Sequence, residues 1–263
     1  MIRATTYPTG ILLQSHENYQ NTVDSNKPCP NGCLHCASAF EIVEIIAELV
    51  EAEGCDINQE GSMGNTPLGW AAYYGHEEVV EMLLGRDDIN PNKPNDEGQT
   101  PLWCAVWNGH EGVVKTLLGR GDVDPNTPDN GGRTPLYCAA HYGHEGVVKM
   151  LLRRNDINPD NSDNDSETPL CGAASAGHQG VVKMLLARGD VNPNKPGQHG
   201  QTPLGYAAGN GHEGVVGMLL ARADVDPNKL DDYGRTPLSY AAEHGYYEMA
   251  KMLIKRGVDV NKF

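Results

Sequence analysis

Hydrophobic residues along this chain recur in pairs that are separated by two positions. A pair of valines is followed by a pair of leucines, as in Val79, Val80, Leu83 and Leu84. Apolar residues at positions i, i+1, i+4 and i+5 share one face of an α-helix. The pattern therefore predicts an amphipathic helix over about Glu77–Leu84, and a copy of it wherever the pattern returns.

A second short helix is predicted just before each of these helices. Thr66 can cap its amino terminus, and Pro67 suits the first helical position because its missing N–H would have no partner there. Ala71 and Ala72 are small enough for another helix to approach closely, and Gly75 can take the left-handed conformation that ends a helix. Each unit is thus a helix, a turn, a second helix and a loop.

These units repeat with a fixed period. The tripeptide Thr-Pro-Leu begins every 34 residues, at Thr66, Thr100, Thr134, Thr168, Thr202 and Thr236. The segments between the helix pairs are rich in Asn, Asp, Gly and Pro, which is typical of turns. Helices of about eight to ten residues are marginal alone in water. We therefore expect the units to stack, so that each buries its apolar face against the next.

The Thr-Pro-Leu, Ala-Ala, Gly-His, Val-Val, Leu-Leu and Asp-x-Asn signals together resemble those of ankyrin repeats. The resemblance implies an all-α repeat solenoid, an ankyrin array of stacked helix–turn–helix units with extended loop or hairpin fingers. One extra residue lies in Asp88-Ile89-Asn90-Pro91-Asn92 and its copies, a variant similar to ankyrin arrays of filamentous fungi. The family also implies that the recurrent His (His76, His110, His144, His178 and His212) opens the second helix and staples it to the adjacent loop.

The period divides the chain into a series of units. Residues 1–28 show no periodicity and are expected to be irregular or disordered. In the first unit Glu41-Ile42 replaces Gly-His, and a continuous helix is expected over Glu41–Glu53. The expected units are a degenerate N-terminal capping repeat (29–60), full repeats (61–94, 95–128, 129–162, 163–196 and 197–230) and a C-terminal capping repeat (231–263).

Charge and composition narrow the partner class. The formal net charge is −15 and the pI is near 5.0, which argues against nucleic acid or an anionic membrane as the partner. No apolar stretch approaches the ~20 residues needed to span a bilayer, and no secretory signal is evident. We expect a monomer in the cytoplasm or nucleus, with its seven Cys reduced.

Candidate sites for chemistry are few. Cys29, Cys33, His35 and Cys36 could bind zinc, but the second half of a paired-ligand motif is missing, and Cys36 occupies an interior helix position. A structural role is favoured. The acidic run Asp160–Glu167 lacks the Gly and Glu that a calcium loop requires and is interpreted as a solvated hairpin tip. No enzyme motif occurs, so we expect no catalysis, metal or cofactor.

Residues that vary between units and face outward are the candidates for binding. In the ankyrin architecture the concave face is formed by the loop fingers and the far end of each first helix. We call the two positions before each Gly-His the concave ladder, and its first half is aromatic. The predicted partner-binding residues, from the ladder and from nearby loops, are Tyr73, Tyr74, Glu97, Gln99, Trp107, Asn108, Arg133, His141, Tyr142, Tyr233, Arg235, Glu243 and His244.

The leading hypothesis is a non-catalytic module that binds a neutral or basic protein partner, because exposed Tyr and Trp on a rigid scaffold favour protein binding. A structural alternative is that Trp107 and Tyr142 only pack against neighbouring units. A functional alternative is a small-molecule or catalytic groove that uses His141, Tyr142, Glu243 or His244. A third is that the chain is the ankyrin fragment of a larger receptor or ubiquitin-ligase-type protein.

Overall fold

A computed structural model describes residues 33–52 and 54–258; the segment 1–28 lies outside this range. Over the described residues the chain forms α-helices joined by loops and two short 3-10 helices, and it contains no strand. The inner helices are α2 (Cys33–Ala39), α4 (Pro67–Tyr74), α6 (Pro101–Trp107), α8 (Pro135–Tyr142), α10 (Pro169–Ala176), α12 (Pro203–Gly209) and α14 (Pro237–Glu243). The outer helices are α3 (Val43–Glu51), α5 (Glu77–Leu84), α7 (Glu111–Leu118), α9 (Glu145–Leu152), α11 (Gln179–Leu186), α13 (Glu213–Leu220) and α15 (Tyr247–Lys255).

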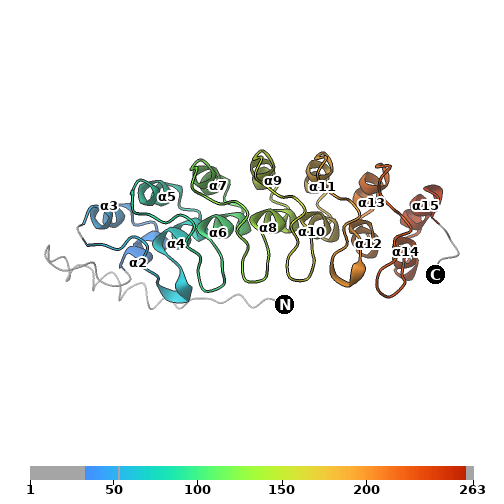
Figure 1. The fold of residues 1–263 in the computed structure, drawn as a ribbon, viewed down its shortest axis with the longest axis horizontal. Helices are drawn as coiled ribbons and strands as arrows, with labels where there is room; N and C mark the ends of the chain where they lie inside the picture. Colours follow the sequence, from blue (N-terminus) through green and yellow to red (C-terminus); the bar gives the residue numbers. More distant parts are fainter. Residues whose placement is uncertain (1–32, 53, 259–263) are drawn as a thin grey trace.

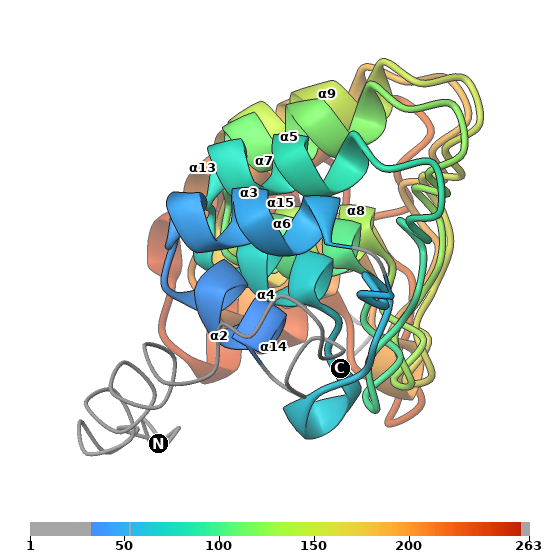
Figure 2. The same cartoon turned by 90° about the vertical axis from the view of Figure 1, so that its left-hand side faces the viewer.

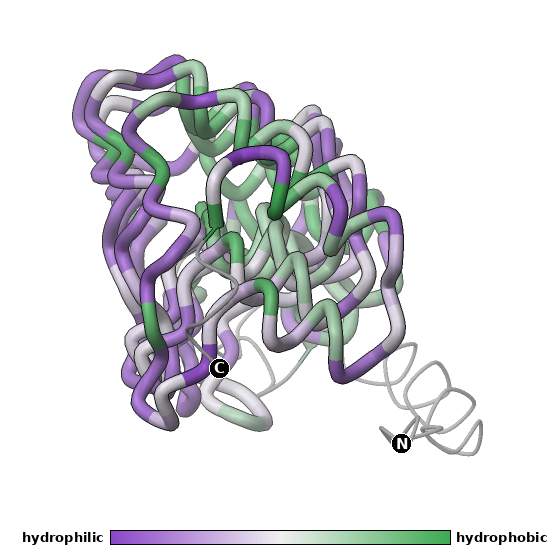
Figure 3. Tube along the Cα trace, turned by 90° about the vertical axis from the view of Figure 1, so that its right-hand side faces the viewer, coloured by the Kyte–Doolittle hydropathy of each residue, from purple (hydrophilic) through white to green (hydrophobic). Residues whose placement is uncertain are grey.

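The helices form two parallel rows in an arched solenoid (Figure 1). The outer helices follow the convex side, and the inner helices lie on the concave side with the loop fingers beyond them. Seen from its end, the array has the connecting loops as a third layer beside the two helix rows (Figure 2). Hydrophobic stretches concentrate in the helix rows, whereas the loops are mostly hydrophilic (Figure 3). The expected all-α solenoid is confirmed.

Local chemistry sets the helix ends as predicted. The Thr66 hydroxyl accepts a hydrogen bond from the backbone N–H of Gly69 at 3.0 Å, and Pro67 is the first residue of α4. Gly75 ends the helix with φ 83°. The outer helix α5 spans Glu77–Leu84, as its periodicity predicts. All six Thr-Pro-Leu threonines cap their helices in this way.

The expected helix over Glu41–Glu53 is wrong at both ends, because α3 spans only Val43–Glu51. Glu41 stands where Gly75 stands one unit later and adopts the same left-handed conformation, with φ 56°. It therefore separates α2 from α3 instead of joining a helix. Its carboxylate lies 3.3 Å from His76 Nδ1.

The paired valines and leucines form one continuous core between the two rows. Val79, Val80 and Leu83 have no exposed surface, and the equivalent valines and leucines of the next four units are equally buried. Burying such a side chain fully contributes about 1.5–3 kcal/mol. Because each unit repeats this burial against its neighbours, the stack is stabilised along its whole length.

The recurrent histidines join consecutive units. His110 Nε2 lies 3.0 Å from the carbonyl oxygen of Tyr73, and His76, His144, His178 and His212 make the same contact one unit back. Since a carbonyl can only accept, Nε2 carries the proton. The expected staple exists, but its target is the inner helix of the preceding unit, not the adjacent loop.

Candidate protein-binding surface on the concave face

The aromatic half of the concave ladder lies at the carboxyl ends of α4, α6 and α8. Tyr73, Tyr74 and Tyr142 are 40%, 41% and 40% exposed. The ring of Tyr74 stacks on Trp70 at 5.9 Å, and Tyr73 meets Tyr74 edge-on at 5.1 Å. These contacts hold each exposed ring in place while leaving part of its surface open.

Trp107 is more buried than an isolated surface anchor would be. Its ring stacks on the buried Trp103 at 5.0 Å, and Tyr142 meets it edge-on at 4.5 Å. Packing on neighbouring rings thus accounts for much of the burial of Trp107, whereas Tyr142 keeps part of its surface exposed. Asn108 is exposed, and its amide donates to the carbonyl of Cys104 at 3.1 Å.

His141 is half-buried beside this group. It stacks on Tyr137 at 5.9 Å, and its Nδ1 is buried without a hydrogen-bond partner. Burial lowers the pKa of His141 and raises that of Tyr137. Both side chains therefore stay neutral near pH 7 and act as apolar surface.

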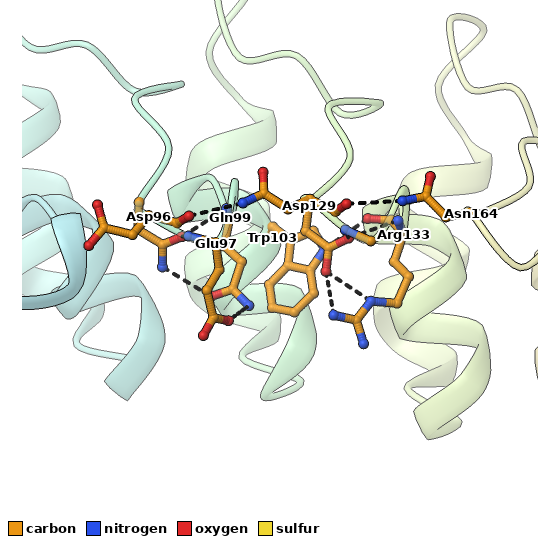
Figure 4. Close-up of polar contacts among 10 residues, drawn as sticks. Asp96, Glu97, Gln99, Trp103, Asp129, Arg133 and Asn164 are labelled. Atoms are coloured by element: carbon orange, nitrogen blue, oxygen red, sulfur yellow. Dashed lines mark hydrogen bonds and ion pairs between the residues drawn. The ribbon is translucent and has the colours of Figure 1, made fainter.

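Arg133, from the loop finger before α8, lies over both Trp103 and Trp107. The Arg133 guanidinium lies 5.9 Å from the ring centroid of Trp103 and 5.8 Å from that of Trp107. It is held by the buried carboxylate of Asp129, which is 2.7 Å away and also accepts two backbone N–H bonds in the same finger. Figure 4 shows this pair beside the Trp103 indole, whose Nε1 donates to the Arg133 carbonyl.

The preceding finger carries a neutral version of the same framework. Asn95 Oδ1 accepts the backbone N–H of Gln99 at 2.9 Å, as Asp129 Oδ1 accepts that of Arg133. The Gln99 amide donates to the Glu97 carboxylate at 2.9 Å, and both lie on the other side of the Trp103 indole (Figure 4).

The remaining predicted residues form a second group in the last unit. Arg235 lies 4.4 Å from the ring of Tyr240 and 5.0 Å from that of Tyr233. His244 Nδ1 contacts the Tyr240 carbonyl at 3.0 Å, and Glu243 is exposed. Units with small residues at the ladder positions, such as Ser175 and Gly209, separate this group from the first (Figure 1).

Trp103 and Asp129 position Arg133 on this surface, but neither was among the candidate site residues predicted from the sequence. Trp103 is buried, and Asp129 resembles any polar loop residue, although its side chain is only 1% exposed. The available signal was the recurrence of an Asp four residues before an Arg in two fingers, Asp129 with Arg133 and Asp231 with Arg235. Burial would raise the pKa of Asp231, but hydrogen bonds from Tyr240 and from two backbone amides hold that pKa below its usual value.

Comparison with known proteins agrees with this architecture. A family model described as ankyrin repeats (3 copies) matches residues 10–95, 34–129, 86–163, 121–196 and 190–263. The chain belongs to the ankyrin repeat family. Among solved structures, the crystal structure of the human ASB11 ankyrin repeat domain is similar, with 25% identity and a TM-score of 0.73 over 86% of this chain and 98% of that one. No curated protein matches the chain.

Ankyrin repeats are generally protein–protein interaction modules and are typically non-catalytic. In this ankyrin array His141 and Tyr142 belong to one unit, whereas Glu243 and His244 belong to the last. A groove that combined residues from both pairs would have to span several units, whereas either pair alone lies within one unit. Two clefts, one between fingers 163–167 and 197–201 and one between α13 and α15, are lined by none of the four.

The zinc hypothesis involves Cys29, which lies outside the described residues. Within the described range no group of three or more His, Cys, Asp or Glu side chains could hold a metal. His35 is buried, with Nε2 2.7 Å from the Gln59 carbonyl. Burial raises the pKa of the Cys36 thiol.

Within the described range no helix has the length and hydrophobicity to cross a bilayer.

The array has one irregular junction between fingers. Elsewhere a fingertip amide donates to the finger before it, as Asn164 does to the Gly131 carbonyl at 2.9 Å. At the next junction Ser166 replaces the usual Gly, with φ 66°, and Gln198 N–H donates instead to the Glu167 carboxylate at 3.2 Å. A Cβ at Gly132 would lie 2.8 Å from the Asn164 nitrogen, so the Ser166 side chain accounts for the displaced finger. A cleft of about 540 Å³ opens there.

Replacing Glu167 by Gln should stabilise the array at pH 7. Burial raises the pKa of Glu167, against the hydrogen bonds from Tyr206 and Gln198, so its folded pKa exceeds the unfolded one. The stability that it contributes is present at low pH and is lost as pH rises through the folded pKa. We expect E167Q to gain less than about 1 kcal/mol, because partial exposure screens the charge. Urea unfolding at pH 4 and pH 7 should show the gain only at pH 7; an equal gain at both would contradict it.

Proposed function

We propose that this chain is a non-catalytic module that binds a protein partner on its concave face. The binding surface comprises Tyr73 and Tyr74, which pack on Trp70, and Tyr142, which packs on Trp107, with Arg133 at its finger edge. The observation that carries the proposal is the 40–41% exposure of three tyrosine rings whose positions are fixed by ring contacts. Rigid aromatic surface of this kind loses little entropy on binding.

The charge of the array supports a neutral or basic partner surface. The net charge of −15 speeds encounter with basic proteins and makes the association rate salt-dependent. We propose that the chain is a monomer of the cytoplasm or nucleus. The last-unit group of Tyr233, Arg235, Glu243 and His244 is proposed as a secondary contact, which only an extended partner would reach.

The triple variant Y73A/Y74A/Y142A should lose at least tenfold in partner affinity, because truncating central aromatic anchors commonly costs 1 kcal/mol or more each. Partners are first captured on the wild-type protein and identified by mass spectrometry; affinities are then measured by calorimetry. The matched control is Y247A, since Tyr247 is 75% exposed on the outer helix α15. Unchanged affinity of the triple variant, with Y247A also unchanged, would refute the binding surface.

A further inference from the structure

Arg133 lies over two tryptophan rings of the preceding inner helix. One unit earlier the same position is occupied by Gln99, which carries no charge. Arg133 covers the ring of Trp107, and Asp129 holds the guanidinium at 2.7 Å. The last unit has a related pair, Arg235 held by Asp231 at 3.1 Å, but this arginine lies over Tyr240 of its own inner helix and not over a ring of the preceding one. In both places a finger arginine, paired with an acid, lies over an aromatic ring of an inner helix.

A shift of 34 residues places Tyr73 at the position of Trp107, Gln99 at that of Arg133 and Asn95 at that of Asp129. The aromatic ring is kept, but both charges of the pair are gone. The Asn95 amide donates to Asn65 Oδ1 at 3.2 Å, which holds this finger against the residue that precedes the cap of α4. Among the described residues no cation lies over the ring of Tyr73 or Trp70, whereas Arg133 and Arg235 cover rings elsewhere.

The surroundings favour a cation at this place. Glu97 is exposed at the edge of the finger. Among the described residues, its carboxylate accepts a hydrogen bond only from the neutral side-chain amide of Gln99. Gly69 stands where Trp103 stands one unit later, so the buried indole that Arg133 also covers has no counterpart at this position. An aromatic face next to an unneutralised carboxylate attracts a guanidinium, which stacks flat and donates to the carboxylate at its rim.

We propose that the partner supplies the missing cation, an arginine side chain that lies over Tyr73 and pairs with Glu97. The inference rests on the proposed concave binding function and specifies its chemistry. The partner segment is therefore basic at this position, in agreement with the net charge of −15. Arginine is preferred to lysine because the planar guanidinium repeats the geometry that Arg133 adopts within the array.

The test uses the peptide acetyl-Gly-Arg-Gly-amide, with its citrulline analogue as an uncharged probe of the same shape. Binding is followed by NMR through the Trp70 indole N–H, with those of Trp103 and Trp107 as internal references. The variant N95D/Q99R builds the Asp129–Arg133 pair into the earlier finger without changing the net charge. We expect saturable shifts at Trp70 with the arginine peptide, at least tenfold weaker binding of the citrulline peptide, and at least tenfold weaker binding to N95D/Q99R.

Equal binding of both peptides, or equal binding to the wild type and N95D/Q99R, would overturn the inference, as would the absence of any Trp70 shift. E97Q gives a second measurement that keeps the ring contacts, and it should weaken the arginine peptide several-fold. The proposed function fails separately, if Y73A/Y74A/Y142A retains full affinity for the captured partner. A partner whose affinity falls in Y142A but is unchanged in N95D/Q99R would support the proposed function and refute only the arginine contact.

Discussion

Replacing Gly143 by Ala should destabilise the array by about 1.5–3.5 kcal/mol, from backbone strain and a lost hydrogen bond together. Gly143 ends α8 with φ 76°, a conformation that costs an L-residue roughly 1–2 kcal/mol. A Cβ there would also lie 2.6 Å from the ring of His178. Moving that ring breaks its 3.0 Å contact with the His141 carbonyl, which contributes about 0.5–1.5 kcal/mol.

The matched control is Gly245, which has nearly the same conformation, φ 74°, but nothing within 4 Å of an added Cβ. G245A should therefore cost only the backbone strain of about 1–2 kcal/mol. Urea unfolding followed by circular dichroism measures both variants. The difference between them isolates the histidine contact between units, and equal losses would show that this contact contributes nothing.

The helix pairs were predictable because their signals are local. Thr66, Pro67 and Gly75 set the ends of α4 within its own sequence, and the valine and leucine pairs set the buried face of α5. The same reasoning failed at Glu41, because a left-handed Glu has no sequence signature. In that conformation its carboxylate lies 3.3 Å from His76 Nδ1 of the next unit, a contact that the local sequence does not reveal.

The proposed binding surface was only partly predictable, since its geometry depends on contacts between units. Tyr73, Tyr74 and Tyr142 were found from their place before Gly-His, and they are exposed. The burial of Trp107 and the stacking of Arg133 could not be inferred, because they require the direction of side chains from two units. The interruption of the ladder was visible in the sequence, where small residues fill the two units after Tyr142.

Replacing Asp129 by Ala should cost about 2–3 kcal/mol and should also release Arg133 from the tryptophans. The carboxylate, 1% exposed, accepts the backbone N–H of Gly131 at 3.0 Å and that of Arg133 at 2.9 Å, besides pairing with the guanidinium. Alanine leaves both amides without an acceptor. The loss of stability stays moderate because the Arg133 side chain is 38% exposed, so water can solvate the guanidinium once the carboxylate is gone.

The control D129N separates the two roles of the carboxylate. The array itself uses Asn at the equivalent Asn95, whose Oδ1 accepts the backbone N–H of Glu97 at 3.0 Å and of Gln99 at 2.9 Å. D129N should therefore keep the finger and lose at most about 1 kcal/mol, the contribution of a partly exposed ion pair. Urea unfolding followed by tryptophan fluorescence reports stability together with the surroundings of the three tryptophans, two of which, Trp103 and Trp107, lie under Arg133. If D129N is as unstable as D129A, then the ion pair with Arg133, and not the backbone hydrogen bonds, holds this finger against the concave face.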